Sequence, residues 1–201
     1  MGQELLNQPL SGLPFAAIDF ESAGSAPGET DSPVQVGIVR IENLFSDTPR
    51  MFDSYIACDR PVRWSAARVH GITSDMLTDA PAFTELWPQL RELLSGCVVV
   101  GHNPSTEMRF LRAFPGHGFG PWLDTLALSR QAIPTLADHS LSNVCRALRI
   151  TAEVEKWVLG RRWHDALFDA AGSLAVLRAI VLGLDMAQAT LSQIPFAVTT
   201  N

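Results

Sequence analysis

Four acidic residues are spread over 150 positions of the chain, and each borders an apolar segment that should be buried. Asp19 and Glu21 end the run FAAIDFE, Glu107 lies in GHNPSTEMRFL, and Asp169 lies in WHDALFDAA. A carboxylate at the edge of a core is costly unless it is paired, hydrogen-bonded or bound to a cation. If the fold brings these four carboxylates together, they would form a site for hard divalent metal ions.

The first two acids are predicted to share one face of a strand. Phe15–Phe20 is a short apolar run that ends in acid, which is typical of a central strand buried on both faces. Residues i and i+2 of a strand project to the same face, so Asp19 and Glu21 can reach one cation while Phe20 points away. The alternative is an ordinary polar strand end, because D-x-E alone is weak evidence.

Glu107 is expected in the first turn of a helix, where two interpretations compete. A helix start favours an acid through its macrodipole, with Ser105 or Thr106 as the cap, and needs no further function. The placement of GHN directly after a β-rich run instead puts Glu107 at a strand-to-helix crossover on the ligand edge of a sheet. Asn103 is expected to tie this loop together.

His164 and Asp169 are five positions apart and would diverge by about 140° on one continuous helix. If Asp165 caps the helix, His164 lies in the preceding loop and can swing over the site. Asp169 then projects from the first turns, and the small residues after it let the helix pack closely on a sheet. The alternative is a solvent-exposed loop histidine beside an ordinary first-turn acid.

The elements needed to position these residues alternate along the chain. Short turns separate the first three strands, which favours antiparallel neighbours, and later strands alternate with helices. The sequence therefore predicts a mixed α/β sheet flanked by helices, with ligands at the carboxyl ends of strands. Besides Phe15–Phe20, the expected strands are Pro33–Ile41, Met51–Ala57, Cys97–Val100 and a short one near Trp122; the expected helices are Ala82–Leu94, Thr106–Phe114, Thr125–Ala132, Leu141–Leu148 and Ala166–Leu182.

Composition indicates one compact domain of 201 residues, with 47% hydrophobic and only 18% charged residues. A net charge of −6 argues against a broad basic face for duplex nucleic acid, although not against binding one strand end. Cys58, Cys97 and Cys145 have neither zinc spacing nor an even count for disulfides. The longest apolar stretch contains Arg178 and is too short to span a bilayer, and no signal peptide is evident, so we expect a cytoplasmic protein.

Taken in order, the motifs resemble the DEDDh 3′-to-5′ exonucleases of the ribonuclease H-like fold, a DnaQ-like family that includes polymerase proofreading subunits. FAAIDFES, GHNPSTEMRFL and WHDALFDA resemble its three motifs, and RVHGIT, LDTLALSR and HSLSNVCRALRI are similar to further stretches. The resemblance covers about residues 14–182. It implies a single exonuclease-like domain over 1–201, with three antiparallel strands plus parallel strands, and a C-terminal tail over 183–201.

The resemblance implies hydrolysis of single-stranded DNA or RNA from 3′ ends to nucleoside 5′-monophosphates, with two Mg²⁺ or Mn²⁺ ions. Asp19 would bridge the two ions, Glu21 and Asp169 would complete the first site, and Glu107 would support the second. His164 would act as the general base, a task suited to a group that titrates near neutrality.

The second motif departs from the family pattern. The family has Phe-Asp where this chain has Thr106-Glu107, so the acid is one methylene longer and its neighbour lacks an aromatic ring. Two alternatives therefore stay open: a catalytically weakened or inactive nuclease-like binding or scaffold module, and a phosphodiesterase acting on short oligonucleotides.

Substrate contacts are also expected from the resemblance. Phe20 and Ser22 would meet the terminal nucleotide, Asn103 would lie with them, and His70 and Ile72 would flank the terminal base. For HGI, a turn with one buried isoleucine is the alternative. The segment after residue 186 carries no docking signal, which leaves a polymerase partner and a homodimer undecided.

Overall fold

The computed structural model describes residues 2–194 and 198–199, and its strands form a six-stranded sheet. The strand order is β3-β2-β1-β4-β5-β6. The pairs β1–β2, β2–β3 and β5–β6 are antiparallel, and the pairs β1–β4 and β4–β5 are parallel, which confirms the predicted mixed α/β sheet. The strands are β1 (Phe15–Ser22), β2 (Pro33–Ile41), β3 (Arg50–Tyr55), β4 (Val98–Gly101), β5 (Trp122–Asp124) and β6 (Val198–Thr199).

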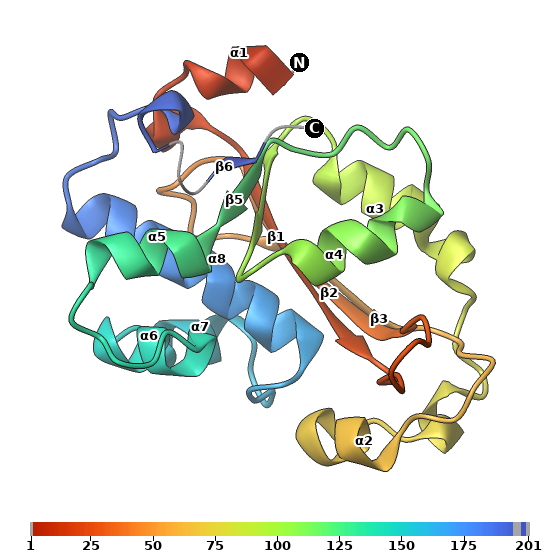
Figure 1. Cartoon of the computed structure of the whole chain (residues 1–201). Helices are drawn as coiled ribbons and strands as arrows, with labels where there is room; N and C mark the ends of the chain where they lie inside the picture. Colours follow the sequence, from red (N-terminus) through yellow and green to blue (C-terminus); the bar gives the residue numbers. More distant parts are fainter. Residues whose placement is uncertain (1, 195–197, 200–201) are drawn as a thin grey trace.

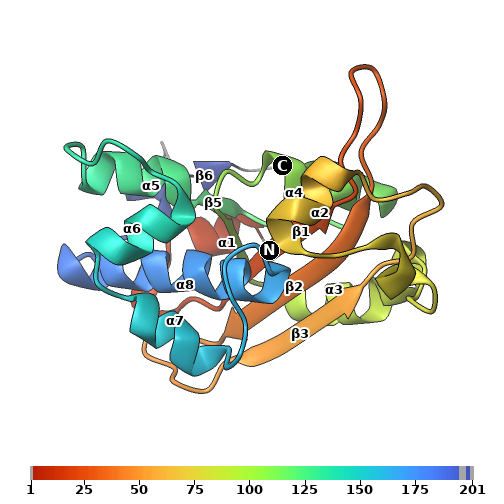
Figure 2. The same cartoon turned by 90° about the horizontal axis from the view of Figure 1, so that it is seen from below.

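Helices cover both faces of the sheet (Figures 1 and 2). The long helix α8 packs on β1 and β2 and has α5, α6 and α7 against it, while α3 and α4 lie on the other face. A further short helix, α2, stands apart from both layers at the lower right of Figure 1. The helices are α1 (Gly2–Leu6), α2 (Trp64–His70), α3 (Trp87–Leu94), α4 (Ser105–Phe110), α5 (Thr125–Ala132), α6 (Leu141–Ala147), α7 (Thr151–Trp157) and α8 (Ala166–Gly183).

Strand β1 separates two hydrophobic cores because its side chains alternate. Phe15 and Ala17 belong to the core under α8, whereas Ala16, Ile18 and Phe20 belong to the core under α3 and α4. A strand buried on both faces explains why its sequence is continuously apolar until the first acid. The same alternation decides which way the acids at its end project.

Predicted and observed elements differ chiefly in their ends. The helix expected over Ala82–Leu94 starts as a 3₁₀ turn (Phe83–Leu86) before α3, and the one expected over Thr106–Phe114 ends at Phe110 and continues as a 3₁₀ turn (Leu111–Ala113). The sequence did not predict α1, α2, α7 or β6. These elements have at most seven residues, too few to show a periodic apolar pattern.

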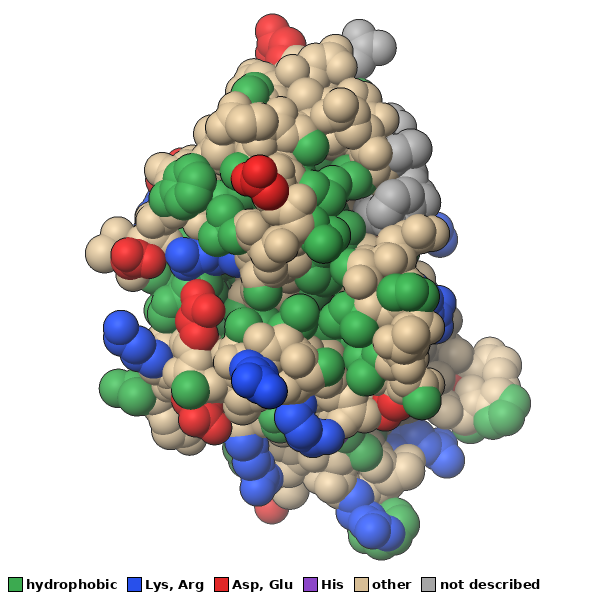
Figure 3. All heavy atoms as spheres, turned by 90° about the vertical axis from the view of Figure 1, so that its left-hand side faces the viewer, with side chains coloured by type: hydrophobic (Ala, Val, Ile, Leu, Met, Phe, Trp, Pro, Cys, Tyr) green, Lys and Arg blue, Asp and Glu red, His purple; other side chains and the backbone are tan. Residues whose placement is uncertain are grey.

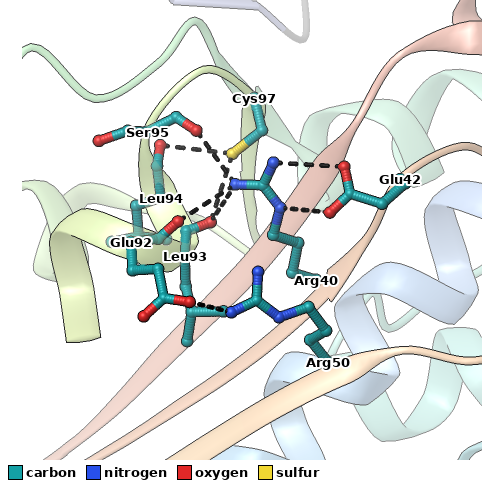
Figure 4. A network of polar contacts seen from close by, with 8 residues as sticks. All are labelled: Arg40, Glu42, Arg50, Glu92, Leu93, Leu94, Ser95 and Cys97. Carbon is teal, nitrogen blue, oxygen red and sulfur yellow. Dashed lines mark hydrogen bonds and ion pairs between the residues drawn. The ribbon is translucent and has the colours of Figure 1, made fainter.

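An arginine on β2 fastens the end of α3 to the sheet (Figure 4). Arg40 donates to the carbonyl oxygens of Leu93 at 2.9 Å and Ser95 at 3.0 Å, which the end of a helix leaves unpaired. Its Nε also donates to Glu42 at 2.9 Å. These contacts position α3 on the face opposite α8. They explain the charges of Arg40 and Glu42 as structural, with no functional role needed.

The segment after α8 also joins the fold. Leu191 and Ile194 are buried in the α8 core, and β6 pairs with β5, so residues 183–201, predicted as a tail, contain packed structure. Within the described residues, α8 is the one helix long and apolar enough to cross a membrane. Because 72% of this apolar 18-residue segment is buried inside the fold, α8 is a core helix of the domain. The side of the molecule on the left of Figure 1 carries charged side chains of both signs (Figure 3).

Candidate active site

The carboxyl end of β1 brings two acids to the face covered by α8. The alternation along β1 directs Asp19 and Glu21 to this face and Phe20 to the other. Phe20 is 6% exposed and packs edge-to-face on Phe83 and Phe110, with ring centroids 5.6 and 5.5 Å apart. Its ring therefore has little surface to offer a substrate, and any contact there would come from its backbone.

A glycine on β2 lets α8 lie against the sheet beside these acids. Gly37 pairs with Asp19 in the β1–β2 ladder. A β-carbon built on Gly37 would lie 2.2 Å from the backbone nitrogen of Leu167 and 2.3 Å from the carbonyl carbon of Ala166. Only a residue without a β-carbon permits this approach. The first turn of α8 consequently reaches the level of Asp19.

Asp165 fixes the start of α8, as its predicted N-cap position requires. Its Oδ1 accepts from two backbone N–H groups of the first turn, at 3.1 and 3.3 Å. Its Oδ2 accepts from Arg161 at 2.7 Å and from the buried amide of Gln35 at 3.3 Å. Arg161 also binds Asp53 on β3 at 2.7 Å. The loop before α8 is therefore fastened to β2 and β3.

His164 occupies that loop rather than the helix. It is exposed and has a left-handed backbone, with φ of 66°. Its backbone N–H donates to Oδ2 of Asp169 at 3.2 Å. One ligand atom from each of Glu21, His164 and Asp169 lies within 4.8 Å of the others. The structure thus brings together residues that are 143 to 148 positions apart in sequence.

Glu107 reaches the site from the opposite helical layer. The N-cap of α4 is Pro104 and makes no side-chain cap, so neither Ser105 nor Thr106 has the capping role weighed above. Glu107 is only 5% exposed, and the backbone at Phe20 on β1 forms a hydrogen bond with its carboxylate. A first-turn acid placed there for the macrodipole alone would be solvated, and this one is not.

Burial raises the pKa of all four acids, and repulsion from neighbouring carboxylates adds to each shift. The pKa of Asp19 lies well above its usual value, first through burial and then through the charges of Asp169, Glu107 and Glu21. Burial, followed by the charge of Asp169, raises the pKa of Glu21 to about 8. Burial also raises the pKa of Glu107 and of Asp169, although backbone hydrogen bonds oppose both shifts. Acids held together at this cost are stabilised by a cation.

One oxygen atom shows that the donor set fits a metal ion. Oδ1 of Asp169 is buried and has no hydrogen-bond partner within the described part of the chain. A buried acceptor without a partner is costly, and native structures rarely keep one without a reason. Carboxylate oxygens from Asp169 and the neighbouring acids are the ligands that Mg²⁺ and Mn²⁺ prefer.

We expect the metal-free protein to lose stability as the pH rises through neutrality. Glu21 has a pKa of about 8 in the folded chain and an ordinary value of 4.5. Between these values the folded chain holds more protons than the unfolded chain, so its free energy of unfolding falls with pH, by up to about 1.4 kcal/mol per unit for one such group. Thermal unfolding in EDTA at about pH 6 and pH 8.5 measures the slope.

Two comparisons sharpen this measurement. Glu21→Gln should flatten the slope, and Mn²⁺ should raise the melting temperature more at the higher pH because protons no longer compete with the ion. A free energy of unfolding that rises with pH in EDTA would show that the pKa of Glu21 is not raised in the folded protein.

The predicted substrate contacts divide into accessible and buried groups. Nδ1 of His70 accepts from the backbone N–H of Ile72 at 3.0 Å, so its Nε2 carries the proton and donates to the carbonyl of Ser22 at 3.1 Å. Ile72 is 3% exposed and packs in a small separate core. Ile72 therefore has almost no surface for contact with a base. Of the two interpretations of HGI, the structure agrees with the turn that contains one buried isoleucine.

Asn103 ties its loop through the backbone. It has a left-handed backbone with φ of 64°, and its N–H donates to Oδ1 of Asp124 at 2.9 Å. Its exposed side chain lines a surface hollow of about 700 Å³ with His102 and His139. The bond to Asp124 therefore holds the loop between β4 and α4, as predicted for Asn103.

Sequence reasoning missed three residues that position the site: Gln35, Gly37 and Arg161. The first two had a signal, since a polar residue and a glycine interrupt the mostly apolar segment over residues 34–39 at positions that a buried strand would fill with larger apolar side chains. The link from Arg161 to Asp53 had none, because the two residues are 108 positions apart.

Comparison with known proteins gives one family and several relatives. The sequence model of the RNase T exonuclease family matches residues 16–177. The DNA polymerase III subunit epsilon-like protein of Rhodobacter capsulatus is 34% identical over 155 residues, which are 75% of this chain and 22% of that protein. The DNA polymerase III PolC-type protein of Thermotoga maritima is 31% identical over 165 residues, 78% of this chain and 11% of that protein. The chain thus spans under a quarter of either relative.

Relatives of similar length and solved structures agree with this family. The DNA polymerase III subunit epsilon of Rickettsia felis is 26% identical over 81% of this chain and 71% of its own. Exonuclease X in complex with 5′ overhanging duplex DNA has a TM-score of 0.70 at 23% identity, covering 90% of this chain and 98% of that chain. The nuclease domain of 3′hExo, a DEDDh family member bound to rAMP, has a TM-score of 0.66 at 16% identity, covering 88% and 95%. The solved structures support the ribonuclease H-like exonuclease fold.

Proposed function

The chain belongs to the RNase T exonuclease family, and from this premise we propose that it is a metal-dependent 3′-to-5′ exonuclease. It would remove nucleoside 5′-monophosphates from the 3′ ends of single-stranded DNA or RNA. The observation that carries the proposal is the buried Oδ1 of Asp169, which has no hydrogen-bond partner among the described residues. Asp169 also lies in one group with Glu21 and His164, and such a group would suit the cation that phosphodiester hydrolysis of this kind requires.

Each site residue has a role in this proposal. Asp19, Glu21, Glu107 and Asp169 would hold two divalent cations, Mg²⁺ or Mn²⁺, which would acidify the attacking water and stabilise the leaving 3′ oxygen. His164 would take the proton from the attacking water, because its ring can reach the acids from the loop. The backbone at Phe20 and Ser22, with His70 bonded to Ser22, would position the terminal nucleotide.

Labelled oligonucleotides test the proposal directly. The protein is incubated at enzyme excess with 5′-labelled single-stranded DNA and RNA and with Mg²⁺, Mn²⁺ or EDTA. We expect stepwise shortening from the 3′ end with metal and none with EDTA. Intact strands under every metal condition would overturn the proposal and leave the inactive binding or scaffold module. Cleavage restricted to chains of a few nucleotides would favour the short-oligonucleotide phosphodiesterase.

Glu107 decides whether the altered second motif still works. We expect Glu107→Gln to lower kcat by about 10- to 100-fold, because an amide keeps the shape but cannot neutralise a cation or orient its water. Glu107→Asp restores the acid of the family pattern and should retain activity within about tenfold. Steady-state kinetics with Mg²⁺ and with Mn²⁺ compare the two variants. Full activity of Glu107→Gln would remove Glu107 from the ligand set.

The relatives also suggest where this activity is used. Because several are named as DNA polymerase III proteins, we propose a polymerase as a partner to be tested by co-purification, and a cytoplasmic location. A homodimer is the competing assembly, which light scattering on the isolated protein distinguishes.

A further inference from the structure

Helix α2 has a side that packs against nothing in the described part of the chain. None of its residues is buried, and Trp64, at 71% exposure, is among the most exposed large hydrophobic side chains of the protein. The guanidinium of Arg68 lies over the Trp64 ring, 4.6 Å from its centroid. Tryptophan is costly to leave in water, and this one contacts the Arg68 guanidinium instead of packing into the core.

The same side of α2 is positively charged, although the protein as a whole is acidic. Arg63 precedes the helix and Arg68 lies in its last turn, and α2 itself contains no Asp or Glu. No carboxylate in the described residues forms an ion pair with either arginine, whereas Arg60 nearby is paired with Glu29 and Asp31.

This surface is continuous with the candidate active site. The last residue of α2, His70, is bonded to Ser22 at the end of β1, and Arg63 at the other end donates its backbone N–H to Ala23 at 2.9 Å. A β-carbon on Gly71 would lie 3.3 Å from the guanidinium of Arg162, so the helix also faces the loop that carries His164. Trp64 is six residues from His70, about 9 Å along the helix axis.

We propose that Trp64, Arg63 and Arg68 form a stacking platform for the single strand that leads into the active site. A base would stack on the exposed ring of Trp64, and the arginines would contact the flanking phosphates. This inference rests on the proposed function and names its substrate more closely. The platform would meet the strand behind its reacting 3′ end, so the preferred substrate would be a single-stranded tail of several nucleotides rather than a mononucleotide ester.

The charge on the platform selects this occupant over a protein surface or a membrane. Two arginines without acidic partners in the described part of the chain, beside an aromatic ring and next to the candidate active site, complement a polyanion whose bases expose π-faces. Every base offers such a face, so the platform would not select a sequence.

Two substrates of different length test the platform. Trp64→Ala and Arg68→Gln are compared with matched exposed controls elsewhere, Phe45→Ala and Arg91→Gln. Binding of a labelled 15-nucleotide strand is measured by anisotropy in EDTA, and hydrolysis of thymidine 5′-monophosphate p-nitrophenyl ester is measured with Mn²⁺. We expect Trp64→Ala to weaken strand binding by about 5- to 150-fold and Arg68→Gln to reduce the salt slope of log Kd by about 0.7, with ester hydrolysis unchanged.

The outcomes separate this inference from the proposed function. If the wild-type protein cleaves both substrates but Trp64→Ala and Arg68→Gln bind the strand as tightly as the controls do, the platform is wrong and the exonuclease stands. If the wild-type protein cleaves neither substrate, the proposed function fails first. Equal melting temperatures of all four variants confirm that folding is intact, and loss of ester hydrolysis in Trp64→Ala would assign the effect to the active site instead of the platform.

Discussion

Replacement of His164 by alanine is expected to lower kcat by about 10²- to 10⁴-fold, the range of a positioned general base. The side chain is exposed and leaves the core untouched, so stability should not change. Initial rates on single-stranded oligonucleotides at saturating metal measure the effect.

Metal binding distinguishes the two roles open to His164. Its ring lies within the same 4.8 Å group as Glu21 and Asp169, a distance that would also suit a ligand. A base leaves the affinity for Mn²⁺ unchanged when it is removed, and titration calorimetry of the variant measures this. If the affinity falls together with kcat, His164 is a ligand, and if kcat is retained, it is neither.

Replacement of Gly37 by alanine is expected to damage both stability and catalysis. The new methyl group would lie 2.2 to 2.4 Å from backbone atoms of Ala166 and Leu167, and backbone cannot rotate away as a flexible side chain can. Overpacking of this kind costs about 1 to 3 kcal/mol of unfolding free energy. The start of α8 must move away from β2 and take Asp169 with it, and a misplacement of about 1 Å can cost on the order of 10² in rate.

A second glycine provides the control for this experiment. Gly12 has no atom within 4 Å of a built β-carbon and a backbone without positive φ, so Gly12→Ala should be neutral. Urea unfolding and oligonucleotide kinetics are measured on both variants. A Gly37→Ala protein with normal kcat would mean that the contact between β2 and α8 does not position the acids.

The fold was predictable because its long segments carry regular patterns. The apolar run of β1 and the 18-residue α8 follow from hydrophobicity and from Asp165 as the cap. By contrast, α2 was missed because a helix with no buried residue shows no apolar periodicity. The 3₁₀ turns at the ends of α3 and α4 depend on tertiary packing, which the local sequence does not encode.

The acids of the site were predictable as candidates, but their environment was not. The sequence showed Asp19, Glu107 and Asp169 at the edges of apolar segments. The near-complete burial of Glu107, and of an Asp169 oxygen that has no partner among the residues described, arises from contacts between distant segments. Ile72 was expected to meet substrate and is instead enclosed in a core cluster. Long-range contacts thus decide which polar and apolar residues remain accessible.

Arg161 has a consequence for how the protein responds to its solution conditions. Its partly exposed guanidinium joins Asp53 of β3 to Asp165, and His164 is carried between these anchors. Ion pairs at such positions weaken as the ionic strength rises and the Debye length shrinks from about 10 Å at 0.1 M salt to about 3 Å at 1 M. High salt would therefore have two effects on this protein. It would weaken the binding of a charged strand, and it would weaken the ion pairs of Arg161 that position the segment carrying His164. The second effect predicts that even a substrate with a single phosphate is turned over more slowly at high salt concentration.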